Sequence, residues 1–259
     1  MNAYFFGDSE SPLFGVLHPP RGMSSLQRGV VLCPPMGQEY MRSHRAYRSL
    51  AGRLARKGFH VFRFDYFGTG DSAGESEEGS PRIWLENIAT AIEELRESAA
   101  VERVTLVGLR LGGALAAIAA TGNSDVEELV LWDPVVDGND FVRELDEVAH
   151  SPLSSSSPGT VGVLGFPFTE LMRQEIQEID LRKSIGASIP AVSILVSSEQ
   201  QAAKELEEAL RAGGADVRYQ LIPSAGNWNE VDNFGGALVP QEIIQGVVTT
   251  LTSRSGRDR

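Results

Sequence analysis

The 259-residue sequence predicts an α/β protein whose mostly parallel central sheet is covered by helices on both faces. The first observation is a set of apolar runs such as 29–35, 101–107 and 190–198, because strands buried on both faces read as nearly continuous hydrophobic stretches. The second is that segments with one apolar helical face alternate with these runs. This alternation produces parallel strands joined by helices, and the right-handed crossover leaves few ways to wind them.

Local signals justify each element in turn. Pro34 and Pro35 end the strand before them, because proline has no N–H for the ladder. The helix at 44–57 carries its apolar residues on one face and ends at Gly58, and Pro81 begins the next helix. The expected strands lie at 3–6, 13–17, 29–35, 59–65, 101–107, 126–134, 190–198 and 216–223. The expected helices lie at 44–57, from 81, up to 120, and at 169–181, 200–212 and 240–252.

One long segment interrupts the alternation. Residues 136–186 hold S-P-L-S-S-S-S-P-G and one predicted helix, and an insertion of this length is expected to fold as a small lid over the carboxyl ends of the strands. Only 151–160 suits a disordered loop. We therefore expect a core of 1–135 and 187–252, a lid or cap at 136–186, and a disordered tail at 253–259.

Composition narrows the classes of partner. The formal net charge of -12 and the pI near 4.8 argue against a nucleic-acid or anionic-membrane partner. The single cysteine, Cys33, allows no intrachain disulfide and fits a reducing compartment. The start of the chain lacks the pattern of a secretory signal, and no apolar run is long enough to span a bilayer. We expect a cytoplasmic protein with no cofactor and no metal site, and the sequence leaves its oligomeric state open.

Two motifs carry the strongest functional signal. Residues 108–113 read G-L-R-L-G-G, between the apolar run V-T-L-V and the helix that follows, and residues 65–74 read D-Y-F-G-T-G-D-S-A-G. In this order and spacing, the chain resembles the α/β-hydrolase superfamily over about 13–252. More narrowly, it resembles the serine aminopeptidase-like hydrolases, including those associated with exosortase systems. The resemblance implies the α/β-hydrolase fold, with a sharp elbow between strand and helix that presents the nucleophile.

The resemblance also assigns roles to individual positions. The elbow glycines match at Gly108 and Gly112, and the nucleophile position is held by Arg110. The N–H of Leu111 matches one donor of the oxyanion hole, and Met36 or Gly37 would supply the second.

The other members of a catalytic triad are not evident. Glu199 is the carboxylate nearest to the acid position, although it also suits the start of a helix. The catalytic histidine should follow the last strand, but no histidine occurs between Pro223 and the final helix. The four histidines lie elsewhere, at positions 18, 44, 60 and 150. Arginine cannot be deprotonated at working pH, so the sequence predicts a degenerate triad, as in a pseudoenzyme.

Arg110 has two compatible interpretations. It binds the carboxylate, phosphate or acyl oxyanion of a ligand beside a helix N-terminus, or it fills space and pairs with an internal carboxylate such as Asp133 or Glu199. Cys33 is an alternative nucleophile, although a buried hydrophobic role is commoner.

Several other residues could take part in a site. Asp65, Asp71 and Ser72 are expected to hold their own turn by hydrogen bonds. An aromatic set could line an apolar pocket or pack in the core: Trp132, Phe166, Phe168 and Trp228.

The leading hypothesis is a protein of α/β-hydrolase fold that binds a small acyl- or carboxylate-bearing molecule without serine-dependent hydrolysis, with Met36, Gly37, Arg110 and Leu111 at the site. Two alternatives stay open. One is an enzyme of another kind, performing acyl transfer, a lyase reaction or cyclisation with Arg110 and the oxyanion hole. The other is a structural partner protein.

Overall fold

The structure is a computed structural model, and it describes residues 1–21, 27–149, 156–157, 160–184, 189, 191–224, 228 and 239–255. Its centre is an eight-stranded sheet with the strand order β1-β2-β4-β3-β5-β6-β10-β11. The pairs β1–β2 and β2–β4 are antiparallel, and all other neighbours are parallel. The strands are β1 (Asn2–Phe6), β2 (Leu13–His18), β3 (Arg28–Cys33), β4 (His60–Phe64), β5 (Arg103–Leu109), β6 (Val126–Trp132), β10 (Ala191–Val196) and β11 (Asp216–Leu221).

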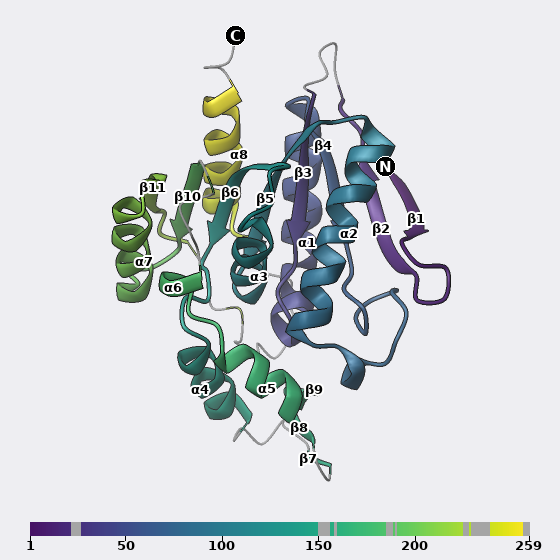
Figure 1. Ribbon diagram of the computed structural model, residues 1–259, viewed down its shortest axis with the longest axis vertical. Helices are drawn as coiled ribbons and strands as arrows, with labels where there is room; N and C mark the ends of the chain where they lie inside the picture. The colour runs from purple at the N-terminus through teal and green to yellow at the C-terminus, as the bar shows by residue number, and fades with distance from the viewer. Residues whose placement is uncertain are drawn as a thin grey trace.

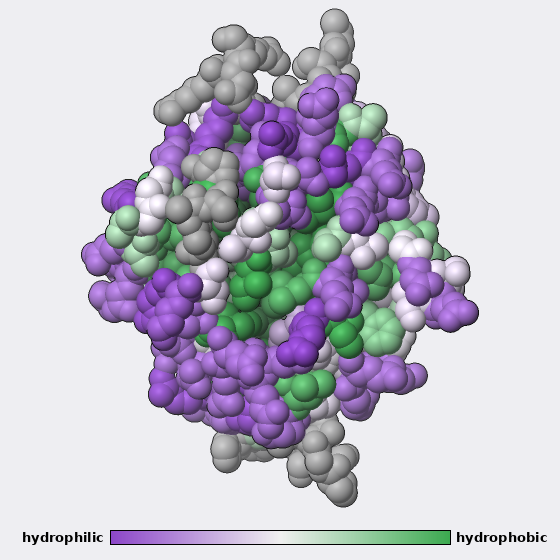
Figure 2. All heavy atoms as spheres, in the orientation of Figure 1, coloured by the Kyte–Doolittle hydropathy of each residue, from purple (hydrophilic) through white to green (hydrophobic). Residues whose placement is uncertain are grey.

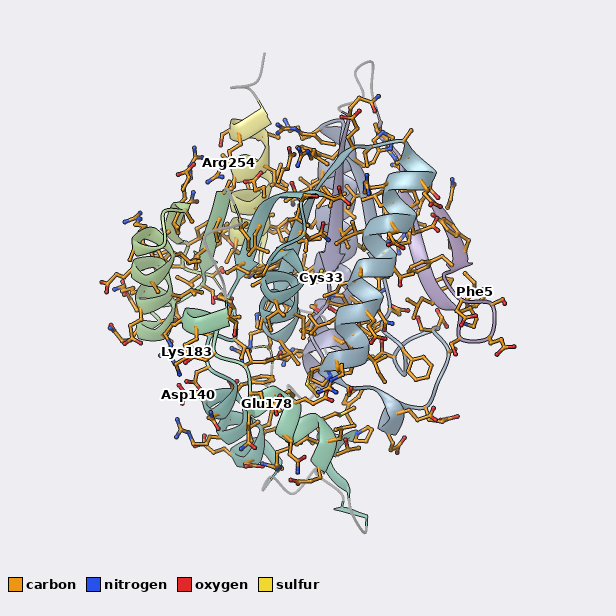
Figure 3. All side chains as sticks on the ribbon, viewed as in Figure 1. Phe5, Cys33, Asp140, Glu178, Lys183 and Arg254 are labelled. Carbon is orange, nitrogen blue, oxygen red and sulfur yellow. The ribbon has the colours of Figure 1, made fainter. Side chains whose placement is uncertain are left out.

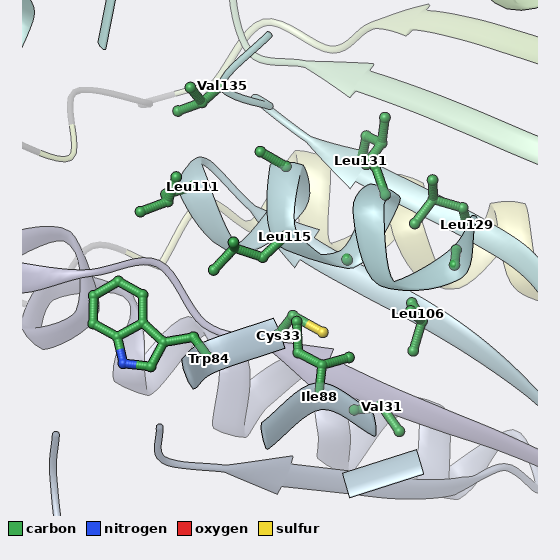
Figure 4. Packing of buried hydrophobic residues seen from close by; sticks show 14 of the residues in the cluster. Val31, Cys33, Trp84, Ile88, Leu106, Leu111, Leu115, Leu129, Leu131 and Val135 are labelled. Atoms are coloured by element: carbon green, nitrogen blue, oxygen red, sulfur yellow. The ribbon is translucent and has the colours of Figure 1, made fainter. Parts of the chain in front are cut away.

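Helices cover both faces of this sheet (Figure 1). One face carries α1 (Gly37–Arg56) and α8 (Gln241–Ser255); the other carries α2 (Pro81–Ala99), α3 (Leu111–Ala120) and α7 (Gln201–Ala212). Successive strand residues supply the two cores alternately, since side chains of a strand point to opposite faces. Thus Val31 and Cys33 pack with α2 and α3 (Figure 4), whereas Val30 and Leu32 pack with α1 and α8. The expected fold class is confirmed.

The segment between β6 and β10 lies beyond the carboxyl ends of the central strands (Figure 1). We call residues 136–186 the insertion. Besides the predicted helix, which is α5, it contains two helices that the sequence analysis did not predict and three short strands that pair with one another. Its elements are α4 (Gly138–Ala149), β7 (Ser156–Ser157), β8 (Thr160–Val163), β9 (Phe166–Thr169), α5 (Glu170–Gln177) and α6 (Leu181–Ser184).

A buried ion pair lies at the end of the sheet opposite the insertion. There Arg254, near the end of α8, pairs with Glu128 of β6, whereas Asp140 of the insertion lies at the other end of the molecule (Figure 3). On the face that carries α2 and α3, apolar side chains gather in the middle and hydrophilic ones surround them (Figure 2). None of the helices in the described part of the chain combines the length and the hydropathy that a membrane span needs.

Several expected boundaries were wrong, and the helix expected at 169–181 ends at Gln177. Helix α1 begins at Gly37, seven positions before the expected start at residue 44. Helix α8 continues to Ser255, so the expected tail at 253–259 is helical over its first residues, and 256–259 lie outside the described residues. A short 3-10 helix, η1 (Ser76–Glu78), lies between β4 and α2. The loop expected at 151–160 lies largely outside the described residues.

Candidate functional site

Arg110 is the single residue between β5 and α3, and its backbone is strained. Its φ of 53° and ψ of -123° lie outside the regions that a side-chain-bearing residue ordinarily occupies. Close backbone packing imposes this turn. A Cβ on Gly108 would lie 2.3 Å from the Gly112 carbonyl oxygen, and one on Gly112 would lie 2.2 Å from that of Pro34. The two glycines therefore let α3 begin directly against the loop that follows β3.

Hydrogen bonds hold the same elbow in place. The buried Tyr47 hydroxyl donates to the Cys33 carbonyl at 2.7 Å and accepts from the Leu109 N–H at 3.0 Å, which joins β3 to β5. The Arg110 N–H donates to the Trp132 carbonyl at 3.1 Å, which joins the elbow to β6. The backbone of Arg110 is thus fixed from both neighbouring strands.

The Arg110 guanidinium is bound by two carboxylates. Its Nε lies 2.7 Å from Glu39 Oε1, and one terminal nitrogen lies 2.5 Å from Glu144 Oε2. Glu39 comes from the first turn of α1 and is only 2% exposed, whereas the Glu144 side chain, from α4 of the insertion, is 43% exposed. The guanidinium also lies over the Phe141 ring, 5.3 Å from its centre. Arg110 thus pairs with internal carboxylates, as one of its two interpretations holds, but the partners are Glu39 and Glu144 and not the suggested Asp133 or Glu199.

Burial and charge act in opposite directions on this pair. Burial lowers the pKa of Arg110, but Glu39 and Glu144 raise it, and the pKa ends above its ordinary value. For Glu39, burial raises the pKa more than Arg110 lowers it. The guanidinium is therefore a permanent cation, and Glu39 is a carboxyl group whose charge is incompletely compensated.

Asp133 lies at the end of β6, in a left-handed backbone conformation with φ of 43°. Its Oδ1 accepts the Ser197 N–H at 2.7 Å and the Gln200 side-chain amide at 3.1 Å. Burial raises the pKa of Asp133 against the lowering effects of Ser197, Arg110 and Trp228. Asp133 therefore occupies the space beside the end of β10, where the resemblance implies the acid.

Glu199 points elsewhere. Its side chain is 64% exposed and pairs with Lys204 of α7. It contributes nothing to the walls of the cavity beside Arg110, which has a volume of about 310 Å³. The residues that line this cavity, which we call the head cavity, are Glu39, Arg110, Asp133, Glu144, Ser197, Ser198, Gln200, Ser224 and Trp228.

The expected oxyanion donors lie at the starts of two helices. Gly37 and Leu111 are the first residues of α1 and α3, and neither helix has a side-chain cap. Among the described residues, neither N–H has a hydrogen-bond acceptor. Both N–H groups therefore lack an acceptor in the described chain, and the packing of Gly112 against Pro34 brings their two loops together.

Met36 and Gly37 also line an apolar cavity of about 130 Å³, which we call the tail cavity. It extends from the first turns of α1 past the turn at 68–70 to Trp84 of α2 and to Phe166 of the insertion. A smaller cavity shares Gly37 with the tail cavity and Glu39 with the head cavity. An apolar space therefore lies against Gly37, and a polar space lies against Arg110, the residue before Leu111.

The other residues that the sequence singled out take structural places. Asp65 accepts from the Tyr40 hydroxyl at 2.7 Å and from the Asp71 N–H, and Ser72 bonds the Asp65 carbonyl, so this turn is held as expected. Cys33 is buried beside Ile88 among apolar residues (Figure 4), and burial raises its pKa.

The aromatic set does not form one pocket. Trp132 and Trp228 pack edge to face with ring centres 5.6 Å apart on the α1 side of the sheet. Phe166 and Phe168 belong to β9 in the insertion and line the small cavity beside Glu39. The histidines at 18, 44 and 60 line none of these cavities, and His150 lies outside the described residues.

A family comparison agrees with this geometry. The family model described as serine aminopeptidase, S33 matches residues 26–166, just over half of the chain. The chain belongs to the serine aminopeptidase S33 family. The matched region of this chain contains the elbow, both candidate oxyanion donors and both carboxylates that bind Arg110. No curated protein matches the chain.

Solved structures resemble this family member over its whole length. Alpha/beta hydrolase domain-containing protein 10 from mouse has 17% identity and a TM-score of 0.61, with all of both chains covered. Est1E from Butyrivibrio proteoclasticus, with ferulic acid bound, has 15% identity and a TM-score of 0.70, with 98% of both chains covered. Proline iminopeptidase from Mycobacterium smegmatis has 12% identity and a TM-score of 0.63, again over both whole chains. At these identities, the likeness establishes the α/β-hydrolase fold.

Proposed function

We propose that this protein has a degenerate catalytic triad and binds a small acyl-bearing ligand without hydrolysing it through a serine acyl-enzyme. The observation that carries the proposal is the residue at the apex of the elbow. Arg110 stands where the resemblance places a nucleophile, and two carboxylates hold its guanidinium. Arginine has no atom that can form an ester with an acyl group at working pH.

The lack of a general base supports the same conclusion. The sequence has no histidine between Pro223 and Gln241, where the base would lie. Ser197, Ser198 and Ser224 carry the hydroxyl groups of the described wall of the head cavity. Because no imidazole accompanies them in the described part of the cavity, these hydroxyls keep the weak nucleophilicity of an ordinary serine.

An acyl group suits the space beside Arg110. The N–H groups of Gly37 and Leu111 would donate to its carbonyl oxygen, and the tail cavity would take its apolar chain. The insertion contributes Phe166 and Met172 to that cavity, which fits a cover over the ligand. A free carboxylate suits the space less well, because it would have to displace Glu144 from Arg110.

The proposal is tested with p-nitrophenyl acyl esters and a serine-directed fluorophosphonate. We expect no covalent labelling, no burst of nitrophenol, and no esterase activity in Arg110→Ser, since the base is missing as well. Stoichiometric labelling of any serine would overturn the proposal. Turnover without labelling would favour instead a non-covalent enzyme that uses the oxyanion donors.

Binding is measured separately by calorimetry with N-methyloctanamide, a neutral amide that cannot act as a labile ester. Met41 lines the tail cavity and is 58% exposed, so Met41→Trp should fill the cavity without disturbing the core. We expect this variant to weaken binding by about tenfold or more. Leu171→Trp is the matched control, because Leu171 on α5 is exposed to a similar extent, 54%, and lies outside the cavity wall. Failure of the amide to bind at all would favour a structural partner role.

A further inference from the structure

The head cavity is negatively charged, although a cation stands at its centre. Glu39, Asp133 and Glu144 face a single Arg110, which gives its walls a formal net charge of -2. Arg110 is already occupied, since its Nε and one terminal nitrogen are bound to carboxylates. A ligand in this cavity therefore meets mainly the negative charge of the carboxylates.

Two carboxylate oxygens of this cavity have no partner within the described chain. They are Glu39 Oε2 and Asp133 Oδ2, and each belongs to a residue that is only 2% exposed. In both residues the other oxygen is well bound, so the carboxyl group is fixed in orientation. Buried carboxylate oxygens without donors are costly, and native proteins ordinarily pair them with a protein or ligand group.

Further polar atoms in the same walls can serve a ligand. Ser224 Oγ also lacks a partner among the described residues, and Ser197, Ser198 and Gln200 line the cavity beside it. Trp228 lowers the pKa of Asp133 as a hydrogen-bond donor to its carboxylate would, although its Nε1 lies outside ordinary hydrogen-bond geometry, so the indole stands beside the oxygen that a ligand would reach. The cavity thus offers an aromatic wall, neutral acceptors and two unpaired anionic acceptors.

We propose that the head cavity binds a protonated amine, whose N–H groups donate to Glu39 Oε2 and Asp133 Oδ2. An ammonium group carries three donors and no acceptor, which complements two carboxylate oxygens and a hydroxyl. The inference rests on the proposed function, because it assigns the charged end of the same ligand: the acyl chain lies in the tail cavity, and the amine lies above Arg110.

A metal ion is a poorer occupant. Among the described residues, no three carboxylate, imidazole or thiol side chains are placed to ligate one ion. The guanidinium beside Glu39 would repel a divalent cation more strongly than a singly charged ammonium group, since the interaction scales with charge. Burial also raises the pKa of both Glu39 and Asp133, which a bound ammonium group would counteract.

The test compares three probes with the same chain length: n-hexylammonium, hexan-1-ol and hexanoate, each titrated by calorimetry against the wild-type protein. Charge-assisted hydrogen bonds predict that the amine binds about tenfold to a hundredfold more tightly than the alcohol, and hexanoate less tightly than either. Equal affinity of the amine and the alcohol would overturn the inference and leave the proposed function standing. Failure of all three probes, together with the amide, would overturn both.

Isosteric variants locate the contact. Glu39→Gln and Asp133→Asn each keep the bonded oxygen and replace the unpartnered one by an NH2 group. We expect each to lose the preference for the amine while the affinity for hexan-1-ol changes less than about threefold. Glu144→Gln is the matched control, because it removes the same charge from a carboxylate of the cavity whose Oε2 already binds Arg110.

If Glu144→Gln abolished the amine preference as fully as the other two variants, net charge alone would explain the binding and the assigned contact would be wrong. The comparison of wild-type affinities stands even where a variant unfolds. Binding of Mg²⁺ in competition with n-hexylammonium would likewise contradict the assignment.

Discussion

Replacing Arg110 by methionine should destabilise the protein strongly, because it leaves Glu39 buried without its cation. Methionine keeps much of the length and apolar stem of arginine. Like arginine, it has no special tolerance for the φ of 53° at this position, so the backbone strain is the same in the variant and in the wild type. Removing one partner of a buried ion pair costs about 3–5 kcal/mol. The Glu39–Arg110 contact at 2.7 Å, with Glu39 only 2% exposed, belongs to that class.

The assay is urea unfolding of four proteins: wild type, Arg110→Met, Glu39→Gln and the double variant. Removing both charges should recover about 2 kcal/mol or more relative to Arg110→Met, since a neutral pair leaves no isolated charge. Glu144→Gln, at a half-exposed partner, should change stability by less than about 1 kcal/mol. The reasoning is wrong if Arg110→Met lies within about 1 kcal/mol of wild type, or if the double variant is no more stable than Arg110→Met.

Three further predictions concern the frame of the site and the far end of the sheet. Tyr47→Phe removes the hydroxyl that joins β3 to β5, and it should cost about 1–3 kcal/mol in urea unfolding. Gly112→Ala places a Cβ 2.2 Å from the Pro34 carbonyl oxygen and should prevent normal folding, which circular dichroism would report. Gly52→Ala, inside α1 with no close neighbour, should instead stabilise the protein by about 0.5–1 kcal/mol. Burial raises the pKa of Glu128 from 4.5 to about 7, so the folded state holds its proton more tightly and stability should fall as pH rises from about 4.5 through 7, by at most about 3 kcal/mol. Glu128→Gln should flatten that dependence, and a wild-type protein that gains stability over this range relative to the variant would contradict the sign.

The fold and the elbow were predictable because their signals are local. Runs of apolar residues mark strands buried on both faces, and the observed sheet has them where the sequence analysis placed them. The elbow follows from Gly108 and Gly112, whose missing side chains permit a backbone contact that no other residue allows. These signals need no knowledge of distant parts of the chain.

The partners of Arg110 were missed because both lie where helix boundaries were misplaced. The apolar pattern of α1 begins at Tyr47, so the preceding turns, which carry Glu39, read as a loop. Helix α4, which carries Glu144, was assigned to no element at all, although Phe141 and Leu145 have helical spacing. Asp137, which precedes α4, accepts the N–H of Asn139. This hydrogen bond is typical of the start of a helix, so Asp137 is a sequence signal that could have located α4.

The charge of the site therefore could not be derived from Arg110 alone. Read in isolation, a guanidinium at a helix N-terminus indicates an anion site. In the folded chain, the same side chain binds Glu39 through Nε and Glu144 through a terminal nitrogen, while Asp133 stands nearby with an oxygen unpaired in the described structure. Each carboxylate reaches the cavity from a different element, α1, α4 or the end of β6, so only tertiary packing sets the balance. Because the net charge of the cavity is negative, we expect Arg110 to orient the carboxylates that receive the charged end of the ligand.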